Sequence, residues 1–97
     1  MGIEYRIKLP SGYQEEFESF LRQARFFQSF DQKFSVFNLR ASGPEKKEDF
    51  PDAYVSCGAD GIVFCDNLTS RKDAAAIFLD LIDYALRKYD RATVEET

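Results

Sequence analysis

The sequence contains no histidine and only two cysteines, and these shortages exclude several kinds of chemistry. Without histidine, the chain lacks the commonest general base near neutral pH and the commonest metal ligand, so it cannot build a Ser-His-Asp or Cys-His catalytic arrangement by itself. Cys57 and Cys65 do not have a C-x-x-C spacing, and a zinc site would need two carboxylates beside them. We therefore predict no catalytic residues, no metal site and no cofactor.

Long apolar runs and clusters of basic residues are missing as well. No apolar stretch approaches the roughly 18 residues of a transmembrane helix, and the opening MGIEYRIKLP lacks the features of a secretory signal. The formal net charge is −4. Because phosphate groups are bound by clustered Lys and Arg, we expect neither nucleic acid nor a membrane as a partner. The expected location is the cytoplasm.

One segment is similar to part of a known nucleic-acid-binding module. The aromatic residues of KFSVFNL, in a strand–helix–strand order, resemble RNA-recognition modules. In those modules basic residues and glycines accompany the aromatics, and a further strand follows the second helix. This segment has no glycine, and no strand pattern follows the last helical segment, so we predict that the chain does not bind RNA.

The residues that are present predict a small globular domain. Of the 97 residues, 44% are hydrophobic and 31% are charged, and ten Phe and five Tyr supply large apolar side chains for a core. This length fits one domain. We predict a single α+β domain over residues 1–90 and a flexible C-terminal tail over residues 91–97.

The first half of the chain predicts a strand, a helix and a β-rich segment. Apolar and charged residues alternate from Ile3 to Leu9, which is typical of a strand with one buried face. Ser11 and Gln14 have the spacing of a capping box, which places the start of a helix at Ser11. Residues 26–40 are rich in β formers and predict either two short strands, about 26–30 and 34–40, or one longer bent strand.

A long loop over residues 41–52 leads into a predicted hairpin. Asp60-Gly61 favours a type I′ turn, and that turn would pair Ala59 with Ile62 and Cys57 with Phe64. One face of the hairpin is then core, and the two cysteines lie on opposite faces. A three-residue loop is the alternative, and it would bring the cysteines together.

The last predicted element is a long helix over about residues 70–89, capped by Thr69 or Ser70. Its apolar positions sweep about 200° of the helix surface, which is too wide for a helix that packs on one surface only. The helix therefore either lies between the sheet and the first helix or takes part in an oligomer. The complete order is β-α-β-β-β-β-α, and it predicts an α+β fold with a mostly antiparallel sheet and two helices packed on one face.

The strand faces predict an apolar surface on the other side of that sheet. Phe34 and Val36 face one way while Phe37 and Leu39 face the other, and the sequence leaves open which side of this strand is buried. The hairpin shows the same property, because apolar residues also lie opposite its core face. The candidate interaction residues are Phe34, Val36, Tyr54, Val63 and Cys65.

Monomeric proteins seldom leave a large apolar patch exposed to water. The first functional hypothesis is therefore a non-catalytic protein-interaction or regulatory module that forms a homodimer through this face of the sheet. The alternatives are binding of another protein, as in an inhibitor or immunity-type role, and binding of a small apolar ligand.

Overall fold

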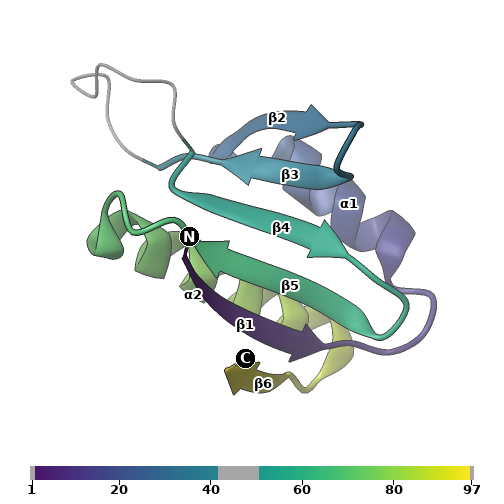
Figure 1. The fold of residues 1–97 in the computed structure, drawn as a ribbon. Coiled ribbons are helices and arrows are strands. Elements are labelled where there is room, and N and C mark those ends of the chain that lie inside the picture. Colours follow the sequence, from purple (N-terminus) through teal and green to yellow (C-terminus); the bar gives the residue numbers. More distant parts are fainter. Residues whose placement is uncertain (1, 42–50, 97) are drawn as a thin grey trace.

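The structure is a computed structural model that describes residues 2–41 and 51–96. Within these residues, the chain forms one six-stranded sheet and two helices, and both helices lie on the same side of the sheet (Figure 1). The elements are β1 (Ile3–Lys8), α1 (Gln14–Gln23), β2 (Phe27–Asp31), β3 (Val36–Leu39), β4 (Ala53–Cys57), β5 (Gly61–Asp66), α2 (Arg71–Tyr89) and β6 (Thr93–Glu96).

The strands follow the spatial order β2-β3-β4-β5-β1-β6, and all neighbouring strands are antiparallel. The predicted α+β class, with an antiparallel sheet and two helices on one face, is confirmed. Residues 26–40 form two strands, β2 and β3, as the first of the two alternatives predicts. Of the predicted 41–52 loop, residues 42–50 lie outside the described residues.

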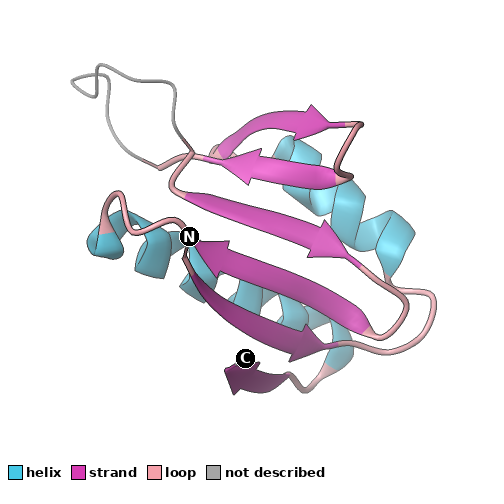
Figure 2. Cartoon of the chain, viewed as in Figure 1, coloured by secondary structure: helices cyan, strands magenta, loops and turns pink. Residues whose placement is uncertain are grey.

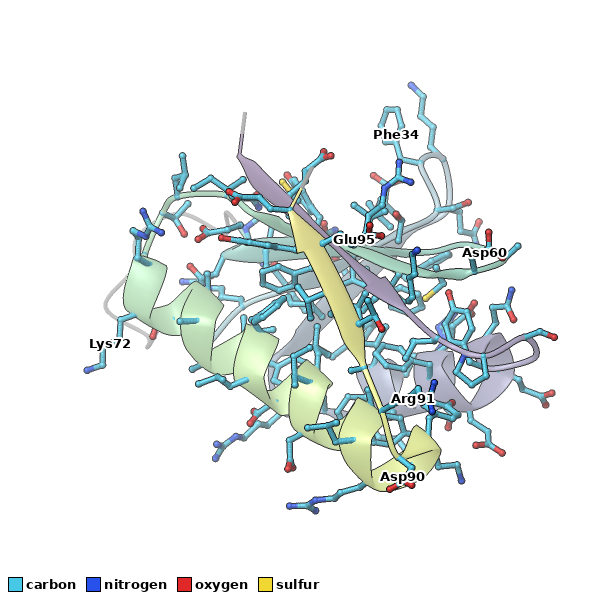
Figure 3. All side chains as sticks on the ribbon, turned by 90° about the horizontal axis from the view of Figure 1, so that it is seen from below. Phe34, Asp60, Lys72, Asp90, Arg91 and Glu95 are labelled. Carbon is cyan, nitrogen blue, oxygen red and sulfur yellow. The ribbon has the colours of Figure 1, made fainter. Side chains whose placement is uncertain are left out.

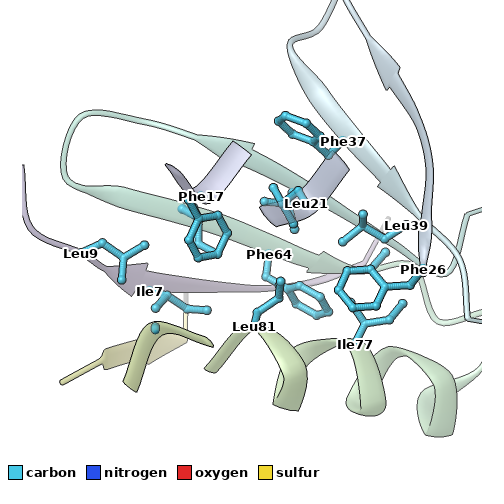
Figure 4. Close-up of a cluster of buried hydrophobic side chains, with 14 of the residues drawn as sticks. Ile7, Leu9, Phe17, Leu21, Phe26, Phe37, Leu39, Phe64, Ile77 and Leu81 are labelled. Atoms are coloured by element: carbon cyan, nitrogen blue, oxygen red, sulfur yellow. The ribbon is translucent and has the colours of Figure 1, made fainter. Parts of the chain in front are cut away.

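The core lies between the sheet and the helix layer (Figure 4). Strands β1, β3, β4 and β5 contribute alternate side chains to it, and each helix contributes one stripe. Phe17 and Leu21 of α1 are fully buried, and so is Leu81 of α2. The other buried apolar residues are Ile7, Leu9, Tyr13, Phe26, Phe37, Leu39, Ala53, Val55, Ile62, Phe64, Ala74, Ile77 and Ala85.

The predicted start of the first helix is wrong, because α1 begins at Gln14 and not at Ser11. Gly12 has a φ of 84°, a backbone conformation that a helix cannot contain. Tyr13 occupies the N-cap position and is buried. Its hydroxyl lies 2.7 Å from the carbonyl oxygen of Gly58 and 2.6 Å from that of Gly61. The helix start is therefore set by a contact with a distant hairpin, which no local capping motif reveals.

The predicted register of the β4–β5 hairpin is also wrong, although its two faces are right. Cys57 pairs with Ile62 rather than with Phe64, and the backbone N–H of Gly58 donates to the carbonyl oxygen of Gly61 at 2.8 Å. The turn therefore centres on residues 59–60, and Gly61 belongs to the strand. The reason is β1, whose Lys8 pairs with Gly61 and leaves no room for a side chain there. Ala59, which was predicted to pair with Ile62 on the core face, is exposed in the turn instead. The shift is by two residues, so the residues within the two strands keep their predicted faces and the two cysteines still lie on opposite faces.

The start of α2 matches the prediction, because the Ser70 side chain accepts a hydrogen bond from the backbone N–H of Asp73 at 3.3 Å. Of the flexible tail predicted over residues 91–97, residues 93–96 instead form β6 and pair with β1, and residue 97 lies outside the described residues. The Lys8 ammonium lies 3.3 Å from the Glu95 carboxylate across this pair. The sequence TVEE has one strongly apolar residue, so β6 is stabilised by the open edge of β1 more than by its own side chains.

Candidate functional site

The face of the sheet opposite the helices is covered by none of the described elements (Figure 2). Side chains on this face alternate along each strand with the buried ones. On the three central strands, β3 to β5, the described side chains of this open face are all uncharged. They are Val36, Asn38, Tyr54, Ser56, Val63 and Cys65.

Three of the predicted interaction residues form a contiguous group at the middle of this face. Tyr54 lies directly opposite Cys65, and Val63 lies opposite Ser56, so Tyr54 and Val63 are diagonal neighbours. All three side chains are partly exposed. The open face of the sheet therefore has an apolar centre, which we call the central patch and define as Tyr54, Val63 and Cys65.

The other two predicted residues lie at one end of the same face. Val36 begins β3 and faces the same side as Asn38, because Phe37 between them is buried. Phe34 lies in the β2–β3 turn, is 66% exposed and projects on the side of the sheet away from the helices (Figure 3). The Lys33 ammonium lies 5.3 Å from the centre of the Phe34 ring. The structure thus places all five predicted residues on one side of the molecule. Phe34 lies at the edge of this group and projects from the β2–β3 turn.

Charged residues border the central patch on the β1 side. Glu4 lies opposite Cys65 and Arg6 lies opposite Val63 in the β1–β5 pair. On the far side of β1, Arg6 pairs with Glu95 of β6. An uncharged centre with a charged border is the usual composition of a protein–protein contact surface.

Comparison of the chain with protein-family models, with curated proteins and with solved structures gives no match. Among the described residues, neither helix has the length and apolar composition that crossing a bilayer requires. In the same part of the chain, no group of three or more Cys, Asp or Glu side chains is placed to hold a metal ion. One argument against RNA recognition is removed, because a strand, β6, does follow the second helix; the acidic charge and the missing glycines remain.

A second apolar surface, which includes none of the predicted site residues, lies along α2. Leu79 is 65% exposed and Leu86 is 47% exposed, and Val94 of the neighbouring strand β6 is 43% exposed. The feature of the sequence that indicates this surface is the wide distribution of apolar residues around the helix. The sequence could not show which half of that sweep is buried, because this depends on where the sheet lies.

A small cleft separates α2 from β6. It has a volume of about 240 Å³, and its apolar walls include Tyr5, Phe64, Phe78 and Val94, while Arg71 is one of its charged lining residues. Ligand pockets usually have volumes of about 300–1,000 Å³. The cleft is thus smaller than most sites for small molecules, so it gives little support to the apolar-ligand hypothesis.

The Cys57 thiol faces the helix side of the sheet, close to Tyr13. Burial raises the pKa of Cys57 to about 12, and the negative charge of Glu18 adds to this, while a hydrogen bond with the Tyr13 side chain acts in the opposite direction. Burial, followed by the charge of Cys57, also raises the pKa of Tyr13. Both groups are therefore held neutral, so Cys57 has the character of an inert core thiol rather than of a nucleophile.

This arrangement predicts a loss of stability at alkaline pH. In the unfolded chain the Cys57 thiol ionises near its ordinary pKa of 9.0, whereas the folded state keeps the proton up to about pH 12. Stability from this group is therefore complete below pH 9 and decreases as the pH rises from 9 toward 12. After a discount for its partial exposure, we expect wild type to lose about 1 kcal/mol more than Cys57→Ala between pH 8 and 10. Urea titrations at both pH values measure this, and parallel curves for the two proteins would contradict it.

Asp52 is a buried carboxylate next to the sheet, and its hydrogen bonds are satisfied. The Thr69 hydroxyl donates to it at 2.6 Å and the backbone N–H of Ala41 donates to it at 2.9 Å. The Asp52 carbonyl oxygen also accepts from the backbone N–H of Asn67 at 3.1 Å. These bonds join the end of β3, the start of β4 and the loop before α2, so the carboxylate links these three segments.

Proposed function

We propose that this chain is a non-catalytic protein-interaction module that self-associates through the open face of its sheet. The observation that carries the proposal is the uncharged middle of that face, where Tyr54, Val63 and Cys65 are partly exposed and have no covering layer among the described elements. Apolar sheet faces pack against one another at about 10 Å and exclude water between them. Covering the central patch with a second copy would therefore be favourable.

The geometry of the face suits a flat partner. Strands β3, β4 and β5 have no charged side chain among the described residues of the open face. A second sheet could therefore pack on this face without burying an unpaired charge. Charges on β1 and β6 would lie at the margin, where water can still solvate them. Phe34 at the opposite margin adds a large apolar ring to the contact area.

Placing a charge in the central patch is expected to break this association. Val63→Glu puts a carboxylate in the middle of the uncharged area, and we expect the dissociation constant of the dimer to rise at least about 100-fold. Light scattering coupled to size exclusion, over a range of protein concentrations, measures the molar mass. Gln23→Glu is the matched control, because it adds the same charge at an exposed position of α1.

Two outcomes would count against the proposal. If Val63→Glu and Gln23→Glu have the same mass as wild type at every concentration, the sheet face is not a self-association surface. If wild type itself is monomeric at high concentration, the chain does not self-associate. Circular dichroism of both variants must match wild type, since a misfolded variant would not test the surface.

A further inference from the structure

The exposed apolar side of α2 has the spacing of a helix–helix contact. Its residues recur every four and three positions along the helix, which is the heptad spacing of helices that pack side by side. This stripe borders the side of the helix that is buried against the sheet, and the two sides meet where stripe residues pack against the core. We call it the α2 stripe and define it as Ala75, Leu79, Ile82, Leu86 and Tyr89.

No described element covers Ala75, Leu79 and Leu86 of the α2 stripe, whereas its Ile82 and Tyr89 are partly buried and pack against the core. Leu79 and Leu86 are the most exposed of its large side chains, at 65% and 47%. Strand β6 runs beside the helix on the sheet side (Figure 3). Its Val94 is partly exposed and lines the cleft together with Ala75, so it extends the apolar area. A partner helix could therefore contact the stripe and Val94 together.

Two unpaired charges mark the ends of the same side of the helix. Lys72 and Asp90 lie at the two ends of α2 (Figure 3). They are 18 residues apart, which is five helical turns, so the helical repeat brings the two backbone positions to the same side of the helix. Neither forms an ion pair with another described residue. A cation in the first turn and an anion at the C-cap both oppose the helix dipole. Within one chain these two charges are therefore not in stabilising positions.

We propose that two copies of the chain pack their α2 helices against each other in antiparallel orientation. In this register, Leu79 lies against Ile82 of the second copy, and the small Ala75 lies against its large Leu86. Lys72 reaches the Tyr89 ring and the Asp90 carboxylate of the second copy, and the twofold axis makes every contact occur twice. The charges that are unfavourable in one chain thereby become a complementary pair between chains.

This contact goes beyond the proposed function and does not depend on it. The α2 stripe and the open sheet face are different surfaces, so either can exist without the other. Where both exist, each with its own twofold axis, the assembly is larger than a dimer. Variants of the two surfaces can therefore be analysed separately.

The first test measures the mass of a protein whose sheet face has been disrupted. With Val63→Glu present, we expect a dimer held by α2, and adding Leu79→Glu should raise its dissociation constant at least about 100-fold. Leu79 is mostly exposed, so this change leaves the core intact. Adding Gln23→Glu instead should leave the dimer unchanged. A monomeric Val63→Glu protein would overturn the α2 contact while leaving the sheet-face proposal standing.

The second test uses reversal of the two charges. In the Val63→Glu background, Lys72→Asp alone and Asp90→Lys alone should each weaken the dimer about 10-fold, and the double variant should restore it. Rescue by the double variant is specific to an antiparallel contact, because only then does residue 72 meet residue 90 of the other copy. Equal dissociation constants for all four proteins would overturn the register.

A zero-length carbodiimide crosslink gives a direct readout of the same contact. Lys72 and Asp90 of one chain are about 27 Å apart along the helix, so an amide bond between them can only join two chains. We expect mass spectrometry of the crosslinked dimer to identify this bond. A dimer band whose crosslinks all involve other residues would contradict the proposed contact.

Discussion

Phe17→Ala is expected to lower the free energy of unfolding by about 3–5 kcal/mol. Phe17 is fully buried at the centre of the helix layer. Its ring meets those of Tyr13, Phe20 and Tyr84 edge-to-face, at centroid separations of 5.9, 5.8 and 5.5 Å. The substitution removes these contacts and leaves a cavity between α1 and α2. Since domains of this size have a total stability of about 5–15 kcal/mol, a large part of the stability would be lost.

Urea titration followed by circular dichroism measures this effect, with Phe34→Ala as its control. Phe34 is 66% exposed in the β2–β3 turn, so its removal should change the free energy of unfolding by less than about 0.5 kcal/mol. If Phe17→Ala were as mild as Phe34→Ala, the helix layer would not be packed as described. The midpoint temperature should show the same order of the two variants.

Gly61→Ala is expected to cost more than about 2 kcal/mol, for a reason that lies in the backbone. Gly61 has a φ of 149°, which side chains rarely adopt. A Cβ atom there would collide with the carbonyl oxygen of Ile7 and would lie 2.9 Å from the Cα of Lys8. Strand β1 would have to move away from β5, weakening the pair at the middle of the sheet.

Gly58→Ala provides the matched control in the same hairpin. A Cβ atom at Gly58 would meet only the carbonyl oxygen of Gly61, at 3.5 Å, which is an ordinary contact. We expect a change of less than about 1 kcal/mol there. Equal losses at the two glycines would mean that general stiffening of the turn, and not the approach of β1, decides the effect. Thermal and urea denaturation of the three proteins distinguish these outcomes.

Local sequence patterns correctly predicted the elements whose structure depends on residues close together in the sequence. The alternation in β1 and the cap at Ser70 are examples, because each depends on residues adjacent in sequence. The start of α1 and the hairpin register were missed, because Tyr13 and Gly61 are each constrained by a strand or turn that is distant in sequence. Strand β6 was missed because its pairing with β1 outweighs a short, mostly polar sequence.

The candidate site was predictable to the extent that it follows from strand faces. Tyr54, Val63 and Cys65 share a face because successive side chains of a strand point to opposite faces of the sheet. A register shift of two residues does not change the face on which a side chain lies. The exposure of Leu79 and Leu86 was not predictable in the same way. When apolar residues cover so wide a part of a helix, the sheet can bury only some of them. Which ones it buries depends on the position of the sheet, and this cannot be derived from the helix sequence.

The position of β1 between β5 and β6 also has a consequence for the order of synthesis. β1 is translated before both of its neighbours, which are supplied by residues 61–66 and 93–96. Its hydrogen-bonding edges stay unsatisfied until most of the chain has been translated, and such non-local pairing slows folding. Emergence of Thr93–Glu96 is therefore the event that closes the second edge of β1 during co-translational folding.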